Sequence, residues 1–498
     1  MDFISDNLPL LPIATPLVGA MVVLVLRRFP RAQPVGALGA MLLSLSFSLL
    51  LLWRVTTGGE AVVLQAGGWR FPYGITLVGD PLSALFAVMA QLVICVGLIY
   101  AIGSKDAIVG YPPFYSLFLL LATGLTGAFL TGDLFNLFVF AELLVISGAA
   151  LTAASDDRFG VEAAYKYFYM SLLASTFMLL AIGSLYVSYG TLNMADLAAR
   201  IAERPDGILL APAIALLLAT FMIKSAVFPF HFWQPDFHAA APTAVSAMLS
   251  SVVVKVGVYG FLRMTTLLFV AQAPLIRGIL VALGVVGVIF GGLSAVGTHN
   301  VKRMLAYSTL AQVGFILVGV GWGTGPAIAA AIVFSFNHSL IKAAMLMLAG
   351  YVASRAPVKS AAFDVVTGVG RFLPAAGLLF FMGGLALSGI PPTNGFISKM
   401  LLFRSGIAAE EYAPLLIIGL ASILTLVYVI RAFQMIWWQS PREGTKAKPG
   451  GDSLLAPALL IGLVLALGIW AEPLVSLALN AGAWLMDPLL YIGAVAGG

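Results

Sequence analysis

The chain has 498 residues, of which 61% are hydrophobic and only 9% charged, and its mean hydropathy is +1.04. Soluble domains carry roughly 25% charged residues, so a soluble fold of this size could not cover its surface with this composition. The net charge of +5 gives no reason to invoke nucleic acid, and a single cysteine, Cys95, excludes a disulfide framework and a cysteine-based metal site. We therefore expect an all-α polytopic membrane protein that forms one integral membrane domain over residues 1–498.

Apolar runs of ~17–25 residues can cross a hydrocarbon core of roughly 30 Å. The sequence contains about 14 such runs, and the first lacks the features of a cleaved signal peptide, so we expect a retained helix there. The tail after residue 472 is a further apolar stretch, broken at Asp487 and Pro488, that suggests a short re-entrant or interfacial piece. The predicted spans are 8–26, 35–53, 81–103, 112–131, 134–154, 166–190, 207–228, 241–265, 272–296, 303–321, 326–353, 372–404, 412–437 and 452–472.

Proline interrupts two of these spans. The segment FPFHFWQP breaks helix 7 near Pro229, and SGIPPTNGF breaks helix 12 at Pro391 and Pro392. Proline removes a backbone donor, and the freed groups are tolerated in a membrane only against protein or water. Two broken spans in corresponding places indicate inverted repeats with a path between them. We predict two inverted five-helix repeats, helices 4–8 over 112–265 and helices 9–13 over 272–437, with helices 1–3 over 1–111 and helix 14 with the tail over 452–498.

Charged side chains at membrane depth are few, and each costs at least ~2.5–3.5 kcal/mol to place there. The one deep carboxylate is Glu142, about 13 Å along its helix from Asp133, which we expect to cap the helix N-terminus. A carboxylate and a lysine placed together can hold both charges, and a change at a neighbouring site then lets the lysine pass its proton on. The deep lysines are Lys224, Lys255, Lys342 and Lys399.

A histidine joins this set. His338 and Lys342 are four residues apart and share one helix face. Histidine titrates near neutral pH and can relay protons, although a hydrogen-bonded core histidine is the alternative. The predicted proton-transfer residues are Glu142, Lys224, Lys255, His338, Lys342 and Lys399. At the mouth of helices 7 and 8, His231, Asp236 and His238 serve either proton uptake or loop packing. We expect no cofactor and no metal site.

The distribution of lysine and arginine between the loops predicts the orientation of the chain in the membrane. Loops after odd-numbered helices carry about 14 of these residues, Arg442 and Lys446 among them, whereas loops after even-numbered helices carry about 7. Because the more basic loops stay in the cytoplasm, both termini should face outward.

Several motifs resemble the antiporter-like subunits shared by respiratory complex I and Mrp-type cation/proton antiporters. They are GDLFNLFVFAELLVISG, KSAVFPFHFWQPDFHAAAPTAVSAMLSSVVVKVGVYGFLR, NVKRMLAYSTLAQVGF, FNHSLIKAAMLMLAG and SGIPPTNGFISKMLLF, and GDLFNLFVFAE with SLYVSYGTLNMADLA favours the D-subunit branch of the Mrp type. The resemblance implies that Glu142 and Lys224 form a coupled pair between helices 5 and 7. It also implies that Lys255 is a bridging lysine, that His338 matches a usually polar position, and that Lys399 is a terminal site.

The function implied is proton translocation within a cation (Na⁺)/H⁺ antiporter of the prokaryotic cell membrane, assembled with subunits of the A, B, C, E, F and G types. An alternative is a redox-driven pump subunit of a complex I-like dehydrogenase or membrane-bound hydrogenase, with any redox centre in partner subunits. A non-transporting scaffold fits poorly, since it need not keep lysines at membrane depth.

Overall fold

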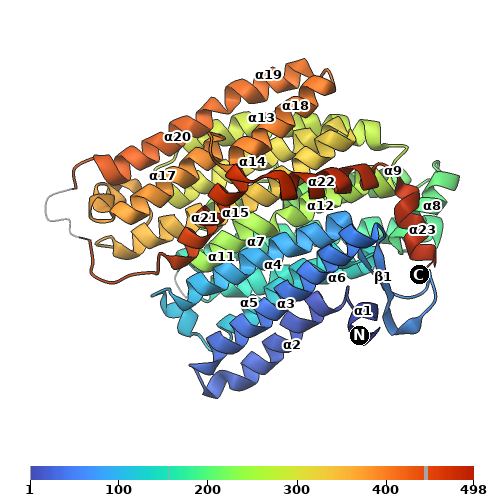
Figure 1. Cartoon of the computed structure of the whole chain (residues 1–498), viewed down its shortest axis with the longest axis horizontal. Helices are drawn as coiled ribbons and strands as arrows, with labels where there is room; N and C mark the ends of the chain where they lie inside the picture. The colour runs from blue at the N-terminus through green and yellow to red at the C-terminus, as the bar shows by residue number, and fades with distance from the viewer. Residues whose placement is uncertain (1, 156–157, 442–446, 498) are drawn as a thin grey trace.

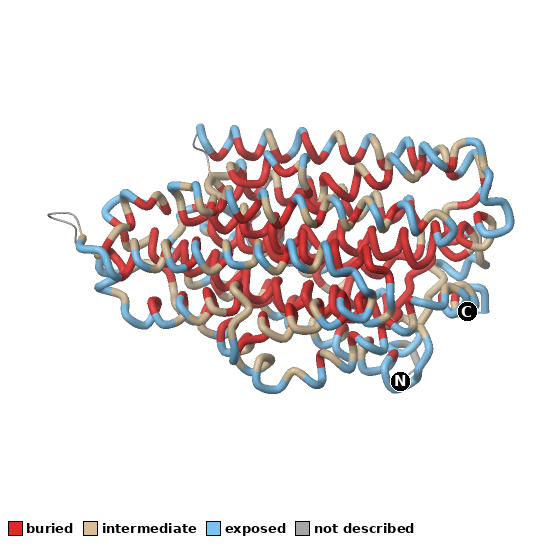
Figure 2. The backbone as a smooth tube through the Cα atoms, turned by 90° about the horizontal axis from the view of Figure 1, so that it is seen from above, coloured by how far each residue is buried: buried red, intermediate tan, exposed pale blue. Residues whose placement is uncertain are grey.

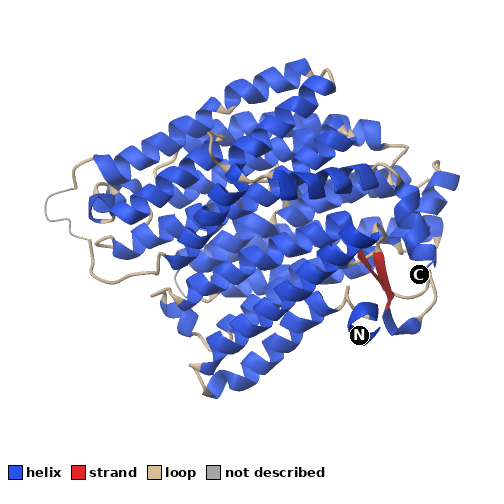
Figure 3. Ribbon diagram, viewed as in Figure 1, coloured by secondary structure: helices blue, strands red, loops and turns tan. Residues whose placement is uncertain are grey.

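Apolar helices make up nearly all of the structure (Figure 3). The computed structural model describes residues 2–155, 158–441 and 447–497, so Arg442 and Lys446 lie outside the described residues. Within this part, ten helices are long and apolar enough to cross a membrane, and the pair α21–α22 passes the same test across a bend of 76°. The predicted all-α membrane fold is therefore confirmed.

The helices follow one another in chain order with short links. In the first half they are α1 Asp2–Asp6, α2 Leu11–Val25, α3 Ala32–Gly58, α4 Pro81–Ile102, α5 Phe114–Leu130, α6 Leu134–Ala153, α7 Arg158–Tyr189, α8 Met194–Glu203, α9 Leu210–Lys224, α10 Trp233–Ala240, α11 Thr243–Met248 and α12 Lys255–Arg263. In the second half they are α13 Ala273–Gly297, α14 Val301–Trp322, α15 Gly325–Arg355, α16 Phe363–Val366, α17 Pro374–Ser388, α18 Asn394–Ala408, α19 Tyr412–Ala421, α20 Ile423–Phe433, α21 Leu455–Ile469, α22 Glu472–Leu485 and α23 Pro488–Gly497.

A small antiparallel hairpin, β1 Val62–Gln65 and β2 Thr76–Gly79, lies at one end of the bundle, with Val62 opposite Gly79 (Figures 1 and 3). Both chain termini lie at this same end (Figure 1). An even number of crossings would give this placement, and the count of fourteen spans stays a prediction. Since α4 starts directly after β2, it ends at the opposite end of the bundle.

Both predicted breaks are present. Helix α9 ends at Lys224 and α10 begins at Trp233, while α17 ends at Ser388 and α18 begins at Asn394. At the second break Gly389 takes φ of +78°, a left-handed conformation that suits glycine at a helix C-terminus. The freed backbone is covered by protein, because a Cβ on Gly468 of α21 would lie 2.1 Å from the Pro392 carbonyl oxygen.

Two spans form the centre of the bundle. The first joins α11 to α12 through the π-helical turn η4 Leu249–Val253, and the second is α15. The apolar part of each is wholly buried, and Figure 2 shows the buried backbone running through the middle of the bundle. Helix α15 packs against α14, α18, α21 and α22. These two spans carry Lys255, His338 and Lys342, so the deepest charged groups lie farthest from lipid.

The tail after residue 472, for which the sequence suggests a short re-entrant or interfacial piece, follows a bend of 76° between α21 and α22, as in a broken span or a re-entrant loop. Helix α22 packs against α15 and α4 as part of the bundle, and α23 follows it. Pro473 in the first turn of α22 and the bend before it explain why the hydropathy pattern ends near residue 472. The break predicted at Asp487 and Pro488 is present, since α22 ends at Leu485 and α23 begins at Pro488.

Candidate functional site

The two central spans bring Lys255 and His338 into contact. The Lys255 Nζ lies 2.9 Å from His338 Nδ1, and both residues are buried. Lys255 follows directly on the η4 π-helical segment, a local widening that often occurs at functional sites. Among the described residues, the His338 imidazole is the hydrogen-bond partner of the Lys255 amine. The two groups can exchange a proton because each exists with and without it.

Lys342 is held by hydroxyl and carbonyl oxygens. Its Nζ donates to Ser308 Oγ at 2.8 Å and to the Leu305 carbonyl oxygen at 3.1 Å. The Ser308 hydroxyl in turn lies 2.6 Å from the Tyr428 hydroxyl of α20. A hydroxyl can donate or accept, so this pair suits both the charged and the neutral amine of Lys342.

A water-sized cavity separates His338 from Lys399. Its volume is about 10 Å³, near the lower limit for one water, and Gln312, His338, Ser398 and Lys399 contribute to its lining. Within the described residues, His338 Nε2 and Gln312 Nε2 have no hydrogen-bond partner. Lys399 Nζ donates to the Ser388 carbonyl oxygen at 2.9 Å, across the break between α17 and α18. A water in this cavity would connect the unpaired nitrogens to the Lys399 amine.

Glu142 and Lys224, which the resemblance pairs, form no direct ion pair among the residues that the structure describes. Glu142 Oε1 accepts from the Ser175 hydroxyl of α7. The Lys224 Nζ is buried but has no hydrogen-bond partner in the described part of the chain. It borders a cavity of about 20 Å³ that is also lined by Ser171 and Trp233, enough for one water. Apolar side chains such as Leu144, Val145 and Val256 make up most of the lining, and Ala141, the residue before Glu142, also contributes to it.

Close packing of α9 against α12 brings Lys224 toward Lys255. A Cβ on Gly257 of α12 would lie 2.5 Å from the Phe221 carbonyl oxygen of α9, so only glycine permits this approach. Ser225 Oγ donates to the Val254 carbonyl oxygen at 3.2 Å. The residue after Lys224 thus touches the residue before Lys255, which places the two lysines on neighbouring backbone segments.

The three residues considered for proton uptake lie in different surroundings. Asp236 pairs with Lys166 at 2.9 Å and with Arg303 at 2.6 Å, so it ties α10 to α7 and α14. His231 packs among Phe228, Phe290 and Tyr307 rings.

The third, His238, is fully buried. Its Nδ1 lies 3.2 Å from Ser246 Oγ, and its Nε2 has no partner among the described residues. His231 Nδ1 is also buried without a partner among the described residues, but His238 is the more deeply buried of the two histidines, at 0% exposed against 9%.

Sequence reasoning missed three groups of polar residues. Ser171 and Ser175 link Glu142 to the Lys224 cavity, and their spacing of four residues in an apolar helix could have revealed them. Ser308 and Tyr428 bind Lys342, but nothing in the sequence brings α14 and α20 together.

The third group centres on Arg263, which the charge pattern alone places in a loop. It lies in α12 and forms a buried ion pair with Asp80, and its Nε donates to the Tyr259 hydroxyl at 3.0 Å. Two residues at the edges of predicted spans therefore pair inside the protein.

Comparison with known proteins places this geometry in a family. Residues 131–425 match the family described as NADH:quinone oxidoreductase/Mrp antiporter, TM. The D subunit of the Na⁺/H⁺ antiporter of Bacillus subtilis (strain 168) is 33% identical over 496 residues, which cover 98% of this chain and 99% of the relative. The chain belongs to the NADH:quinone oxidoreductase/Mrp antiporter transmembrane family.

Two solved structures share the fold of this family member. A chain of the Mrp complex from Dietzia sp. DQ12-45-1b matches with a TM-score of 0.91 and 27% identity, covering 99% of this chain and 100% of that one. A chain of an archaeal membrane-bound sulfane sulfur reductase matches with a TM-score of 0.90 and 30% identity, covering 98% and 100%. The resemblance inferred from the motifs is confirmed.

Proposed function

We propose that this chain is the proton-conducting subunit of a multisubunit cation (Na⁺)/H⁺ antiporter. Protons pass along Glu142, Lys224, Lys255, His338, Lys342 and Lys399 in the middle of the membrane. The observation that carries the proposal is the contact between Lys255 Nζ and His338 Nδ1, 2.9 Å apart on two wholly buried spans. Buried ionisable side chains in such places serve ion and proton pathways far more often than stability.

The similarity to antiporter D subunits over almost the whole chain supports the coupling to sodium. One charge moving through 100 mV releases about 2.3 kcal/mol, which can drive cation extrusion when the two movements are coupled. A hard cation prefers several oxygen ligands, and Glu142 with its single serine partner does not supply them. Sodium therefore crosses in a partner subunit, and the partners are the A, B, C, E, F and G types.

The orientation follows from charge. Lys359 pairs with Asp106 in the link after α4, at the end of the bundle opposite the termini. Lys166 and Arg303 pair with Asp236 near the ends of helices that reach the same side. That end therefore faces the cytoplasm of a prokaryotic cell, and both termini face outward. Labelling of a cysteine introduced near the C-terminus from outside intact cells tests this placement. Labelling only in broken cells would reverse it.

The second candidate is a redox-driven pump subunit, which the match to the sulfane sulfur reductase chain favours. In such a pump the same residues would carry protons, but electron transfer in partner subunits would supply the energy. Affinity purification of the tagged chain from its native membrane separates the two. We expect small hydrophobic membrane subunits to copurify and sodium to collapse a preformed ΔpH in vesicles. Copurified iron–sulfur proteins, with no sodium-dependent ΔpH, would favour the pump.

A further inference from the structure

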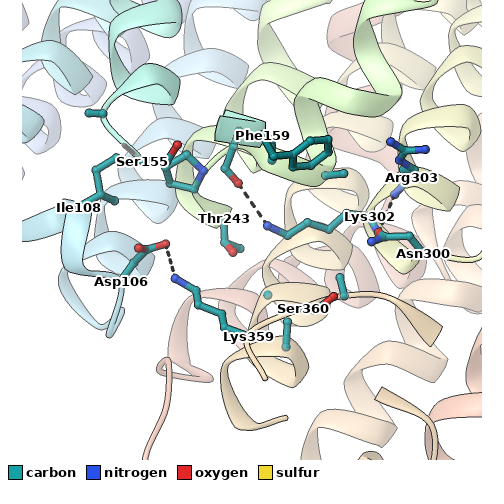
Figure 4. A pocket seen from close by; sticks show the side chains of 18 of the residues that line it. Asp106, Ile108, Ser155, Phe159, Thr243, Asn300, Lys302, Arg303, Lys359 and Ser360 are labelled. Carbon is teal, nitrogen blue, oxygen red and sulfur yellow. Dashed lines mark hydrogen bonds and ion pairs between the residues drawn. The ribbon is translucent and has the colours of Figure 1, made fainter. Parts of the chain in front are cut away.

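A large vestibule opens at the end of the bundle opposite the termini. Its volume is about 1190 Å³, and it is lined by the links that follow α4, α6, α10, α13 and α15. Figure 4 shows Lys302 in this vestibule together with the ion pair between Asp106 and Lys359, whose charged atoms are 2.9 Å apart. A space of this size holds many waters, so it carries solvent from the surface to the buried residues at its wall.

Lys302 is the buried cation of this wall. Its residue is 8% exposed, and its Nζ makes one hydrogen bond, to the Ala241 carbonyl oxygen at 3.3 Å. Lys302 lies in the first turn of α14, where a cation meets the positive end of the helix dipole. Helix stability would favour an acidic or polar residue at this position. Helix stability therefore does not explain why a lysine occupies position 302.

The start of α14 joins Lys302 to the interior. Lys342 Nζ binds the carbonyl oxygen of Leu305, three residues and about 4.5 Å farther along the same helix. Lys302 Nζ donates to the carbonyl oxygen of Ala241, three residues after the buried His238, and α10, which carries His238, packs against α14. His238 Nε2 has no partner in the described part of the chain. Three titratable groups thus gather around one helix turn, with the vestibule on one side and the relay on the other.

We infer that Lys302 takes up protons from the vestibule and passes them inward to His238 and Lys342. This inference rests on the proposed function. The proton leaves the Lys302 ammonium for the free imidazole nitrogen of His238 or the neutral amine of Lys342. A hydronium ion in the vestibule then protonates the Lys302 amine again and becomes water. Lys302 lines the vestibule, whereas His231 and Asp236 are not among its lining residues, so the proposed uptake passes through Lys302 rather than through them.

Substitution at Lys302 separates proton uptake from a structural role. Lys302→Gln keeps a donor for the Ala241 carbonyl but cannot carry a proton, whereas Lys302→His can. In the assembled complex in vesicles we expect Lys302→Gln to lower sodium-dependent proton movement at least about tenfold, with Lys302→His retaining several times more. Lys359→Gln removes one positive charge from the same vestibule at an exposed site and should stay within about twofold of wild type. Equal activity of the glutamine and histidine variants, at any level, would overturn the inference.

A second measurement leaves Lys302 in place. Ser360→Cys, in a Cys95→Ala background, puts a thiol on the vestibule wall, and a bulky thiol reagent is added after assembly. We expect the reagent to inhibit proton movement by at least about half, because it fills the solvent path. The matched control is Ser453→Cys, a capping serine bonded to the Gly103 region at the same end but outside the vestibule, which should be insensitive. Full transport by the labelled Ser360→Cys complex would overturn the inference.

The proposed function is tested in the same vesicles by Lys399→Ala. If wild type moves protons and Lys399→Ala does not, the relay stands whatever happens at Lys302. If wild type itself shows no sodium-dependent proton movement, the proposed function fails.

Discussion

The two broken helices hold their lysines in different ways. Lys224 ends α9 with an amine that has no partner among the described residues, beside a cavity of about 20 Å³. Lys399 lies just after its break, bonded at 2.9 Å to the Ser388 carbonyl oxygen and 5.2 Å from the centre of the Phe315 ring. The first amine is free to change partners, whereas the second is fixed. We infer that Lys224 at the first break exchanges protons with its neighbours in the relay, and that Lys399 at the second break is the last proton site of the relay.

Removal of the fixed lysine should have the largest effect. Lys399→Ala removes the titratable side chain that lines the His338 cavity opposite His338, so we expect sodium-dependent proton movement to fall below detection while the complex still assembles. Fluorescence of a ΔpH dye in vesicles, with the amount of assembled complex measured by blotting, checks this. Normal turnover would mean that protons leave the protein elsewhere.

Disturbing the site without removing its lysine should have a smaller effect. Gly389 takes φ of +78°, and a Cβ there would lie 2.5 Å from Lys399 Cδ. Gly389→Ala adds about 1–2 kcal/mol of backbone strain and pushes Lys399 from the Ser388 carbonyl, so we expect roughly tenfold slower transport.

Gly462→Ala is the matched control for this variant. Gly462 has open space where the methyl group would go, so the substitution should leave transport unchanged. Equal rates for the two variants would show that Lys399 needs no fixed position.

We expect an intermediate loss of transport when Ser175, which binds Glu142, is replaced. Ser175→Ala removes the hydroxyl that binds Glu142, and a hydrogen bond to a charged group contributes about 1.5–3 kcal/mol. Because a water can take its place, we expect a loss of about threefold to tenfold rather than abolition. Ser184→Ala, an exposed serine of the same helix bonded only to its own backbone, should behave as wild type. An unchanged rate in Ser175→Ala would remove this serine from the path.

The smallest effect is expected at Tyr428. Tyr428→Phe removes one hydroxyl from the Lys342–Ser308–Tyr428 chain, and a neutral hydrogen bond contributes about 0.5–1.5 kcal/mol, which corresponds to a twofold to tenfold change. Ser308→Ala should give the same loss, and the double variant should lose no more than either alone. Tyr189→Phe, which breaks a hydrogen bond to the Arg204 carbonyl in the other half, is the control. Additive losses would mean that the two hydroxyls act independently.

The sequence predicted the breaks and the deep charges because each is costly in an apolar run. A lysine among twenty apolar residues stands out, and Lys255, His338 and Lys399 were found in this way. Ser175 does not stand out, since serine is common in membrane helices and matters here only because it faces Glu142. The sequence did not identify Lys302 as a buried residue, because the predicted span begins at residue 303 and Lys302 was therefore assigned to the preceding loop.

Helix boundaries set a second limit. Arg263 falls at the end of an apolar run, yet its pairing with Asp80 draws it into the protein interior. That pairing joins residues 183 positions apart, so no local sequence pattern predicts it. The predicted inverted repeats stay a prediction, although each contains one of the two breaks.

Glu142→Ala tests the central claim most directly, because Glu142 is the carboxylate from which the predicted relay starts. The measurement is sodium-dependent ΔpH in vesicles that contain the assembled complex, with Glu162→Ala, an exposed glutamate paired with Lys166, as the matched control. We predict no sodium-dependent ΔpH for Glu142→Ala and a wild-type response for Glu162→Ala. A wild-type response from Glu142→Ala, with assembly intact, would contradict the account.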